Sequence, residues 1–207
     1  MALSTVAYDM GLQEAIETRR SIRRYSPDPI PQEDIAEVLR LSSLAPSAWN
    51  LQPWRFIVVQ DPQLKAQLCE VAYNQPQLVT APVVIVLYSD MQETLANLDE
   101  VMPPTMPAAK REGYQQGILD AFAGMSTAEQ ESWGAGQSYI ALGFLMLAAR
   151  SLGYHTSPML GFDADKAKAL LNLPPHVVIP ALVPIGLSSD EGYPRYRHDL
   201  ERLVTFR

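Results

Sequence analysis

Apolar residues recur along this chain with the spacing of helices in some segments and of strands in others. Helical spacing is found at 10–16, 31–45, 62–73, 126–152 and 164–171, and residues 108–123 could also form a helix. Short runs rich in β-branched residues, which favour strands, lie at 56–59, 82–88 and 177–185, with a further short strand predicted at 154–157. The mixture excludes all-α and all-β folds and predicts either an α/β or an α+β fold.

The longest predicted helix starts and stops at recognisable signals. Ser126 and Glu129 have the spacing of a capping box, and Gly153 follows the last helical residue. Inside it, residues 139–149 are apolar on every face, and this run is too short to span a membrane. We therefore expect the helix to be buried all round, with a subunit interface supplying part of the cover.

Prolines set the expected limits of other elements. Pro31 suits the first turn of one helix, Pro46 ends it, and Asp163 is positioned to cap the helix at 164–171. The strand at 177–185 contains two prolines, so we expect an edge or irregular strand, whereas the strand at 56–59 is expected to be buried.

The character of the chain changes between Met91 and Trp133. Met102 to Pro107 is a proline-rich break, and the helix after it lacks a strong apolar stripe. We interpret residues 1–207 as a single domain with a flap insertion at about 91–127 that covers a site.

Composition excludes several classes of protein. The 207 residues carry a net charge of −7, which argues against binding to nucleic acids or to anionic membranes. Cys69 is the one cysteine, so no intrachain disulfide can form and a reducing compartment is expected. We see no signal peptide and no membrane span, and predict a cytoplasmic protein.

Common catalytic motifs are missing. His155, His176 and His198 have no partners at metal-ligand spacing, so no metal site is predicted. The stretch Gly134 to Ile140 begins like a dinucleotide fingerprint, but a tyrosine replaces its third glycine, and it also lacks the last glycine of a nucleophile elbow.

Two polar segments suggest a different chemistry. Arg19-Arg20-Ser21-Ile22-Arg23-Arg24-Tyr25 places four guanidinium groups within six positions, and these groups match phosphate oxygens well. Pro46-Ser47-Ala48-Trp49-Asn50-Leu51-Gln52-Pro53-Trp54 is a rigid loop that carries hydrogen-bond donors.

With these two segments the sequence resembles the FMN-dependent nitroreductase family, and the resemblance covers nearly the whole chain. The first segment resembles the family's N-terminal phosphate motif. The second resembles the family's Pro-Ser-x-x-Asn-x-Gln-Pro-Trp loop, and Asn74 to Gln77, Leu152 to Tyr154, Pro158 to Asp163 and Gly186 to Arg197 follow in the family's order. The resemblance implies an α+β, three-layer α/β/α-like fold, with a mixed sheet flanked by helices, and an intertwined homodimer. Two FMN sites would lie at the interface, and the C-terminal segments would cross onto the partner.

The resemblance also implies which residues bind FMN. Arg19, Arg20 and Ser21 would hold its phosphate with Arg195 or Arg197, and Arg23 would lie near N1 and the C2 oxygen. Asn74 and Gln77 would bond the pyrimidine edge, while the backbone amides of Leu160 and Gly161, in the turn with Pro158 and Met159, would face N5 and O4. Pro46, Ser47, Ala48, Asn50 and Gln52 would reach the flavin of the other subunit.

Each of these assignments competes with a simpler interpretation. The polar residues of 46–52 also suit turn formation, and those of 74–77 suit a solvated turn. One of Arg195 and Arg197 is expected to be ordinary surface charge. Four aromatic residues either line the flavin or belong to the core, which we favour: Trp49, Tyr73, Phe122 and Trp133.

The implied activity is oxidation of NADH or NADPH through FMN by a ping-pong mechanism. The oxidant would be a small molecule such as a nitroaromatic or a quinone, with an enone, a halogenated phenol or flavin as alternatives. No side chain is expected to act as acid or base, because the protein supplies position and charge. The alternatives from other classes are a protein that sequesters FMN without turnover and a plain structural domain.

Two positions depart from the residues that other family members have. Many relatives have lysine at the position of Gln77, which bears on the redox potential of the flavin. Some relatives have glutamate at the position of Leu160, which bears on substrate preference.

Overall fold

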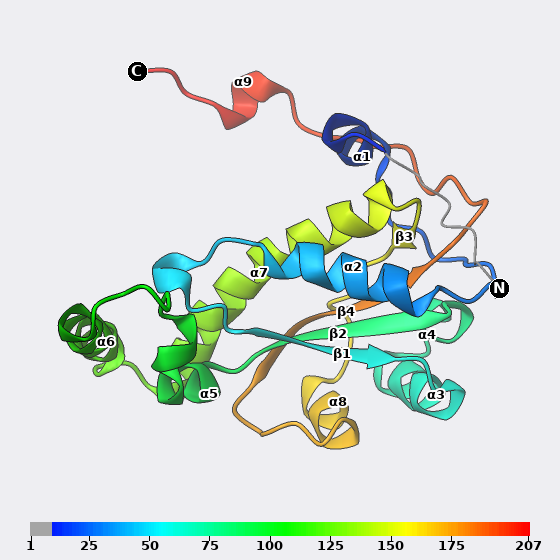
Figure 1. Ribbon diagram of the computed structural model, residues 1–207. Helices are drawn as coiled ribbons and strands as arrows, with labels where there is room; N and C mark the ends of the chain where they lie inside the picture. Colours follow the sequence, from blue (N-terminus) through cyan, green and yellow to red (C-terminus); the bar gives the residue numbers. More distant parts are fainter. Residues whose placement is uncertain (1–9) are drawn as a thin grey trace.

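The computed structural model describes residues 10–207, and within them helices cover both faces of one sheet (Figure 1). The strands are β1 (Trp54–Val59), β2 (Val83–Ser89), β3 (His155–Thr156) and β4 (Val178–Gly186). Among the described residues they form a four-stranded sheet in the order β1-β2-β4-β3, and every pair is antiparallel. A parallel element is limited to an isolated bridge between Ser21 and Thr156. The α+β, three-layer prediction is confirmed.

Alternation along β2 divides the core into two layers. Val83, Ile85 and Leu87 pack with helices α2 (Gln32–Ser43) and α7 (Thr127–Ser151) on one face of the sheet. Val84 and Val86 face α3 (Pro62–Val71) and α8 (Ala164–Leu170) on the other. Because successive side chains of a strand point to opposite faces, this central strand supplies both cores.

Several helix ends match their sequence signals. Ser126 and Glu129 form the predicted capping box of α7, Gly153 has φ 86 directly after its last turn, and Asp163 accepts from the Lys166 N–H at the start of α8. These caps satisfy backbone groups that a helix leaves free at its ends. The stretch Gly134 to Ile140 lies inside α7, so it is no phosphate-binding turn.

The strand β4, expected to be an edge or an irregular strand because of its prolines, is irregular. It has a register shift opposite Leu87 and Ser89, and it is an interior strand of the sheet. The Pro184 carbonyl accepts from the Ser157 N–H, so the proline nitrogen also faces the β3 side, where pairing is sparse. The missing N–H therefore leaves the ladder with β2 intact. The strand predicted to be buried at 56–59 is instead part of an edge strand, β1, and only Trp54 and Val59 of β1 are buried because no strand covers its outer side.

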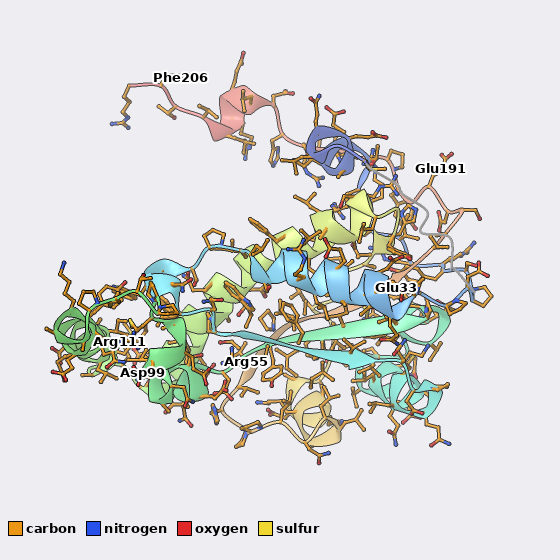
Figure 2. All side chains as sticks on the ribbon, in the orientation of Figure 1. Glu33, Arg55, Asp99, Arg111, Glu191 and Phe206 are labelled. Atoms are coloured by element: carbon orange, nitrogen blue, oxygen red, sulfur yellow. The ribbon has the colours of Figure 1, made fainter. Side chains whose placement is uncertain are left out.

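The segment predicted as a flap folds around a small core of its own. It contains α5 (Met91–Ala96), which the sequence did not predict, the 3₁₀ turn η2 (Leu98–Val101) and α6 (Ala108–Phe122). Leu98, Ile118 and Phe122 pack together there with Leu51 of the polar loop. Figure 2 shows the side chains of Asp99 and Arg111 within this segment, where they form an ion pair.

Three short helices, α1, α4 and α9, complete the described fold. Helix α1 (Leu12–Thr18) lies against α7, and its Leu12 and Ile16 are exposed, while α4 (Gln77–Thr80) is a single turn before β2. The C-terminal residues, including α9 (Leu200–Leu203), form an arm that leaves the body, with Phe206 near its tip (Figure 2). No helix among residues 10–207 has the length and apolarity that a membrane span requires.

Helix α7 is not buried all round in the single chain. Tyr139, Ile140 and Phe144 are 47%, 40% and 40% exposed, although Ala141 and Leu145 on its other faces are fully buried. These three side chains form an apolar strip along the middle of the helix, which we call the α7 strip.

Candidate functional site

The arginine run at Arg19–Arg23 lies directly after α1 and is held in an extended conformation. The Ile22 N–H donates to the Thr156 carbonyl at 3.2 Å, and the Ile22 side chain is fully buried. Since side chains alternate in extended backbone, Ser21 and Arg23 are directed away from the core. Both line a cavity of about 170 Å³, together with Arg19, Arg20, Tyr193, Pro194, Arg195 and Arg197.

The C-terminal segment closes this arginine cavity by packing on the run itself. Gly192 has φ +69, and a Cβ there would lie 2.9 Å from Ile22 Cδ1. Glycine is therefore required both for its backbone conformation and for the close approach. Ser188 Oγ donates to the Arg24 carbonyl at 2.6 Å, and the Arg23 guanidinium lies 5.8 Å from the centre of the Tyr193 ring.

The electrostatics of the arginine cavity favour an anion. Burial, together with the charges of Arg195, Arg197 and Arg20, lowers the pKa of Arg19. Within residues 10–207, no carboxylate forms an ion pair with any arginine of the cavity. The cationic groups therefore repel one another, and a bound anion would relieve that repulsion.

Arg195 and Arg197 differ in how their guanidinium groups are used. Arg195 Nη2 donates to the carbonyl of Glu17 at 2.7 Å, at the C-terminal end of α1. Arg197 donates only to the carbonyl of the adjacent Tyr196 among the described residues. Arg197 thus keeps more donors free for a ligand, while Arg195 ties the C-terminal segment to α1.

A second cavity, of about 530 Å³, adjoins the arginine cavity and shares Ser21, Arg23 and Tyr193 with it. We call it the ring cavity. Its other lining residues are Arg24, Gln75, Pro76, Gln77, Asp190 and Gly192. Gln77 lines it and is 3% exposed, whereas Asn74 is exposed and does not line it. Gln75, for which the sequence suggested no role, lines the cavity instead.

The turn at Pro158–Gly161 reaches this region through Gln75. Gln75 Nε2 donates to the Gly161 carbonyl at 2.8 Å, and Leu160 is 67% exposed. Met159 is buried and pairs with Leu182 of β4, so its side chain belongs to the core. The structure thus brings Arg19 to Arg23, Gln75 to Gln77, Gly161 and the C-terminal segment into one region.

The polar loop at 46–52 lies elsewhere in the same chain (Figure 1). It contains the 3₁₀ turn η1 (Ala48–Asn50), and the Ala48 N–H donates to Gln137 Oε1 of α7, whereas Arg150 of α7 bonds Thr18 beside the arginine run. The thirteen helical positions from Gln137 to Arg150 correspond to about 20 Å. A single chain therefore does not bring this loop to the arginine cavity.

Side chains of the polar loop are engaged within the loop or with the flap segment. Ser47 Oγ accepts from the Gln52 N–H at 3.0 Å, and Asn50 Nδ2 donates to the Val101 carbonyl at 3.1 Å. Pro46 and Ala48 are exposed.

Backbone strain is concentrated in the polar segments. Four of the six described non-glycine residues with positive φ lie in the segments 46–54 and 74–77, and a fifth, Tyr73, directly precedes the second segment; the four are Trp49, Asn50, Gln52 and Asn74. Positive φ is uncommon for such residues, and strain of this kind clusters at functional sites.

The four aromatic candidates separate in the structure. Phe122 is buried, and Trp49 and Trp133 contact it, with ring centres 5.8 and 5.0 Å from that of Phe122. This favours the core reading for Phe122, whereas Trp49 is partly exposed and Tyr73 is largely exposed.

One cluster of titratable groups was not expected from the sequence. His176, predicted to be isolated, lies 3.2 Å from Asp90, and the buried Glu131 is close to both. Glu131 accepts from the Met91 N–H and from Ser89 Oγ, and burial raises its pKa. These residues come from three distant segments, so no spacing in the sequence could reveal them. The two hydrogen bonds of Glu131 join α7 to the end of β2 and to the start of α5.

Comparison with known proteins gives a consistent result. The family model described as "Nitroreductase family" matches residues 16–187. An "NADH dehydrogenase" of Thermus thermophilus is 49% identical over 189 residues, covering 91% of this chain and 92% of the relative. Protein DrgA of Synechocystis is 31% identical, covering 86% of this chain and 85% of the relative.

Solved structures agree with the sequence relatives. A protein of Exiguobacterium sibiricum, described as a nitroreductase and solved in complex with FMN, has a TM-score of 0.87 and 29% identity to this chain. The match covers 95% of this chain and 97% of that protein.

Proposed function

This chain belongs to the nitroreductase family, and from that premise we propose that it is an FMN-dependent oxidoreductase that takes electrons from NADH or NADPH and passes them to a small organic oxidant. The coarse activity, oxidoreduction, agrees with the names of its relatives. The residue roles, the oxidant and the dimer that follow are our inferences.

The observation that carries the proposal is the arginine cavity. A phosphate monoester carries close to two negative charges at neutral pH, and guanidinium groups bind it through paired, charge-assisted hydrogen bonds. Burial and the repulsion from the neighbouring arginines lower the pKa of Arg19, so an anion of this charge fits the donor set. In this proposal Arg19, Arg20, Ser21 and Arg197 hold the phosphate.

The ring cavity supports the rest of the cofactor assignment. It adjoins the arginine cavity and is lined by Gln77, whose amide group suits the alternating donors and acceptors of a pyrimidine edge. Arg23 lies between the two cavities and adds positive charge. When bound, FMN supplies the capacity to accept and return a hydride. The chain's own groups orient the cofactor and bias its potential through charge and hydrogen bonds.

A second copy of the chain would complete the site. The loop at 46–52 is about 20 Å from the arginine cavity along α7, so its amides can serve only another subunit's cofactor. The exposed α7 strip and the apolar residues of the C-terminal arm, among them Leu200 and Phe206, need cover that a partner would supply. We therefore propose a homodimer with FMN at the interface.

The test is the visible spectrum of the purified protein under anaerobic conditions, before and after NADH and then NADPH. A bound flavin that bleaches and recovers with a nitroaromatic or a quinone supports the reductase. A bound flavin that neither nucleotide reduces would favour a sequestering protein. No flavin, even after soaking with FMN, would refute the assignment of the arginine cavity.

A further inference from the structure

A short chain of amide groups joins the two segments that face the ring cavity. Gln77 Nε2 donates to Gln75 Oε1 at 3.1 Å, and Gln75 Nε2 donates to the Gly161 carbonyl at 2.8 Å. Gln75 is thus the link between α4 and the turn at Pro158–Gly161. The sequence alone pointed to Gln77 and Gly161 at the two ends of this hydrogen-bonded series, and not to Gln75 between them.

The direction of these hydrogen bonds is determined by chemistry. A backbone carbonyl can only accept, so the amide nitrogen of Gln75 must face Gly161. Its amide oxygen then faces Gln77, which must present a nitrogen in return. Among the described residues, the Gln77 oxygen has no hydrogen-bond partner of its own and remains available as an acceptor in the ring cavity.

The backbone around Gly161 depends on this contact. The turn is anchored at Met159 by its pairing with Leu182, and at Asp163, whose N–H donates to the Val71 carbonyl at 2.8 Å. Between these anchors, Leu160 is exposed and Gly161 has no Cβ to restrict its backbone. Gln75 therefore supplies the polar contact that orients the middle of the turn.

Gln75 is itself rigidly held. Its N–H donates to the Ala72 carbonyl at 3.3 Å, and its carbonyl accepts from Cys69 Sγ at 3.3 Å. The two residues before it, Tyr73 and Asn74, have positive φ. A side chain on such a constrained turn loses little entropy when it binds a second segment, which suits it for preorganisation.

We propose that Gln75 is a positioning residue that fixes the Leu160–Gly161 backbone amides relative to Gln77 and thereby sets the relative affinity of the site for oxidised and reduced FMN. This inference rests on the proposed function, because it assumes that the flavin ring lies in the ring cavity with N5 facing those amides. Backbone N–H groups can only donate. The N5 atom accepts a hydrogen bond in oxidised flavin and carries a proton after two-electron reduction, so ordered amides favour the oxidised form.

The test replaces Gln75 by methionine, which has similar length and no N–H donor, and compares it with Gln32→Met. Gln32 of α2 donates to Gln60, which directly follows β1, in an exposed amide pair, so the control loses the same kind of bond away from the cavities. FMN affinity is measured by fluorescence titration, and the midpoint potential of the bound flavin by equilibration with a reference dye.

We expect Gln75→Met to bind oxidised FMN about tenfold more weakly, with a smaller loss for the reduced form and a higher midpoint potential than in Gln32→Met. A tenfold difference between the two losses corresponds to about 30 mV for a two-electron couple. Equal weakening of both forms, or unchanged affinity and potential, would overturn the positioning role. Failure of the wild-type chain to bind FMN would instead overturn the proposed function.

A second variant serves if Gln75→Met does not fold. In Gln75→Glu the ionised carboxylate opposes the Gly161 carbonyl, whereas the protonated carboxyl can donate to it. FMN affinity relative to wild type at the same pH should therefore recover as the pH falls toward about 5. A ratio that does not change with pH would refute the role of the Gln75 donor.

Discussion

Replacing Arg19 by methionine should have opposite effects on the unliganded protein and on its FMN complex. The substitution keeps an unbranched side chain and removes the charge and all donors. A hydrogen bond to a charged group contributes about 1.5–3 kcal/mol, so FMN binding should weaken about ten- to a hundredfold. In the unliganded chain, burial and three neighbouring arginines lower the pKa of Arg19, so loss of its charge should leave stability unchanged or increased.

The assay combines FMN titration with thermal unfolding in the absence and presence of excess FMN. The stabilisation by FMN should shrink in Arg19→Met, since ligand stabilisation follows the dissociation constant. Arg40→Met is the matched control, because Arg40 is an exposed arginine paired with Glu37 on α2. An unchanged dissociation constant, or an apoprotein destabilised as much as the complex, would refute the reasoning.

Three further predictions follow from packing and charge. Gly192→Ala should destabilise the protein by about 1–3 kcal/mol in denaturant unfolding, whereas Gly136→Ala, whose added Cβ meets no atom within 4 Å, should not. Burial raises the folded-state pKa of Glu131 above its usual 4.5, so the stabilising contribution of Glu131 is present at low pH and is lost as the pH rises through the folded-state pKa. Relative to Glu131→Gln, the unfolding free energy of the wild-type protein should therefore decline above about pH 4.5. Parallel plots of unfolding free energy against pH for the two proteins would contradict this. Phe144→Glu should convert the proposed dimer to monomer in sedimentation experiments, and an undiminished mass would exclude the α7 strip from the interface.

Local signals in the sequence identified most elements correctly. The capping box at Ser126, the cap at Asp163 and the glycine after α7 act within a few residues, so their geometry is encoded where they stand. The α+β class also followed, because hydrophobic periodicity reflects which faces are buried. Family motifs pointed to the arginine run and to the C-terminal segment, and residues of 19–23 and of 193–197 line one cavity.

Long-range pairing decided what local signals could not. The prolines of β4 suggested an edge or irregular strand, and β4 is irregular but interior, with the Pro184 nitrogen facing the sparsely paired side. Helix α5 is only six residues long and follows β2 directly, so it gave too short a pattern to detect.

The sequence by itself determined the kinds of elements and the chemistry available, because periodicity, caps and residue types are properties of neighbouring positions. Only the tertiary structure decided that Gln75 bonds Gly161, that His176 meets Asp90 and Glu131, and that the loop at 46–52 lies far from the arginine cavity. Such contacts join segments separated by up to 86 positions. Their formation depends on how the helices pack on the sheet, and no local pattern carries that information.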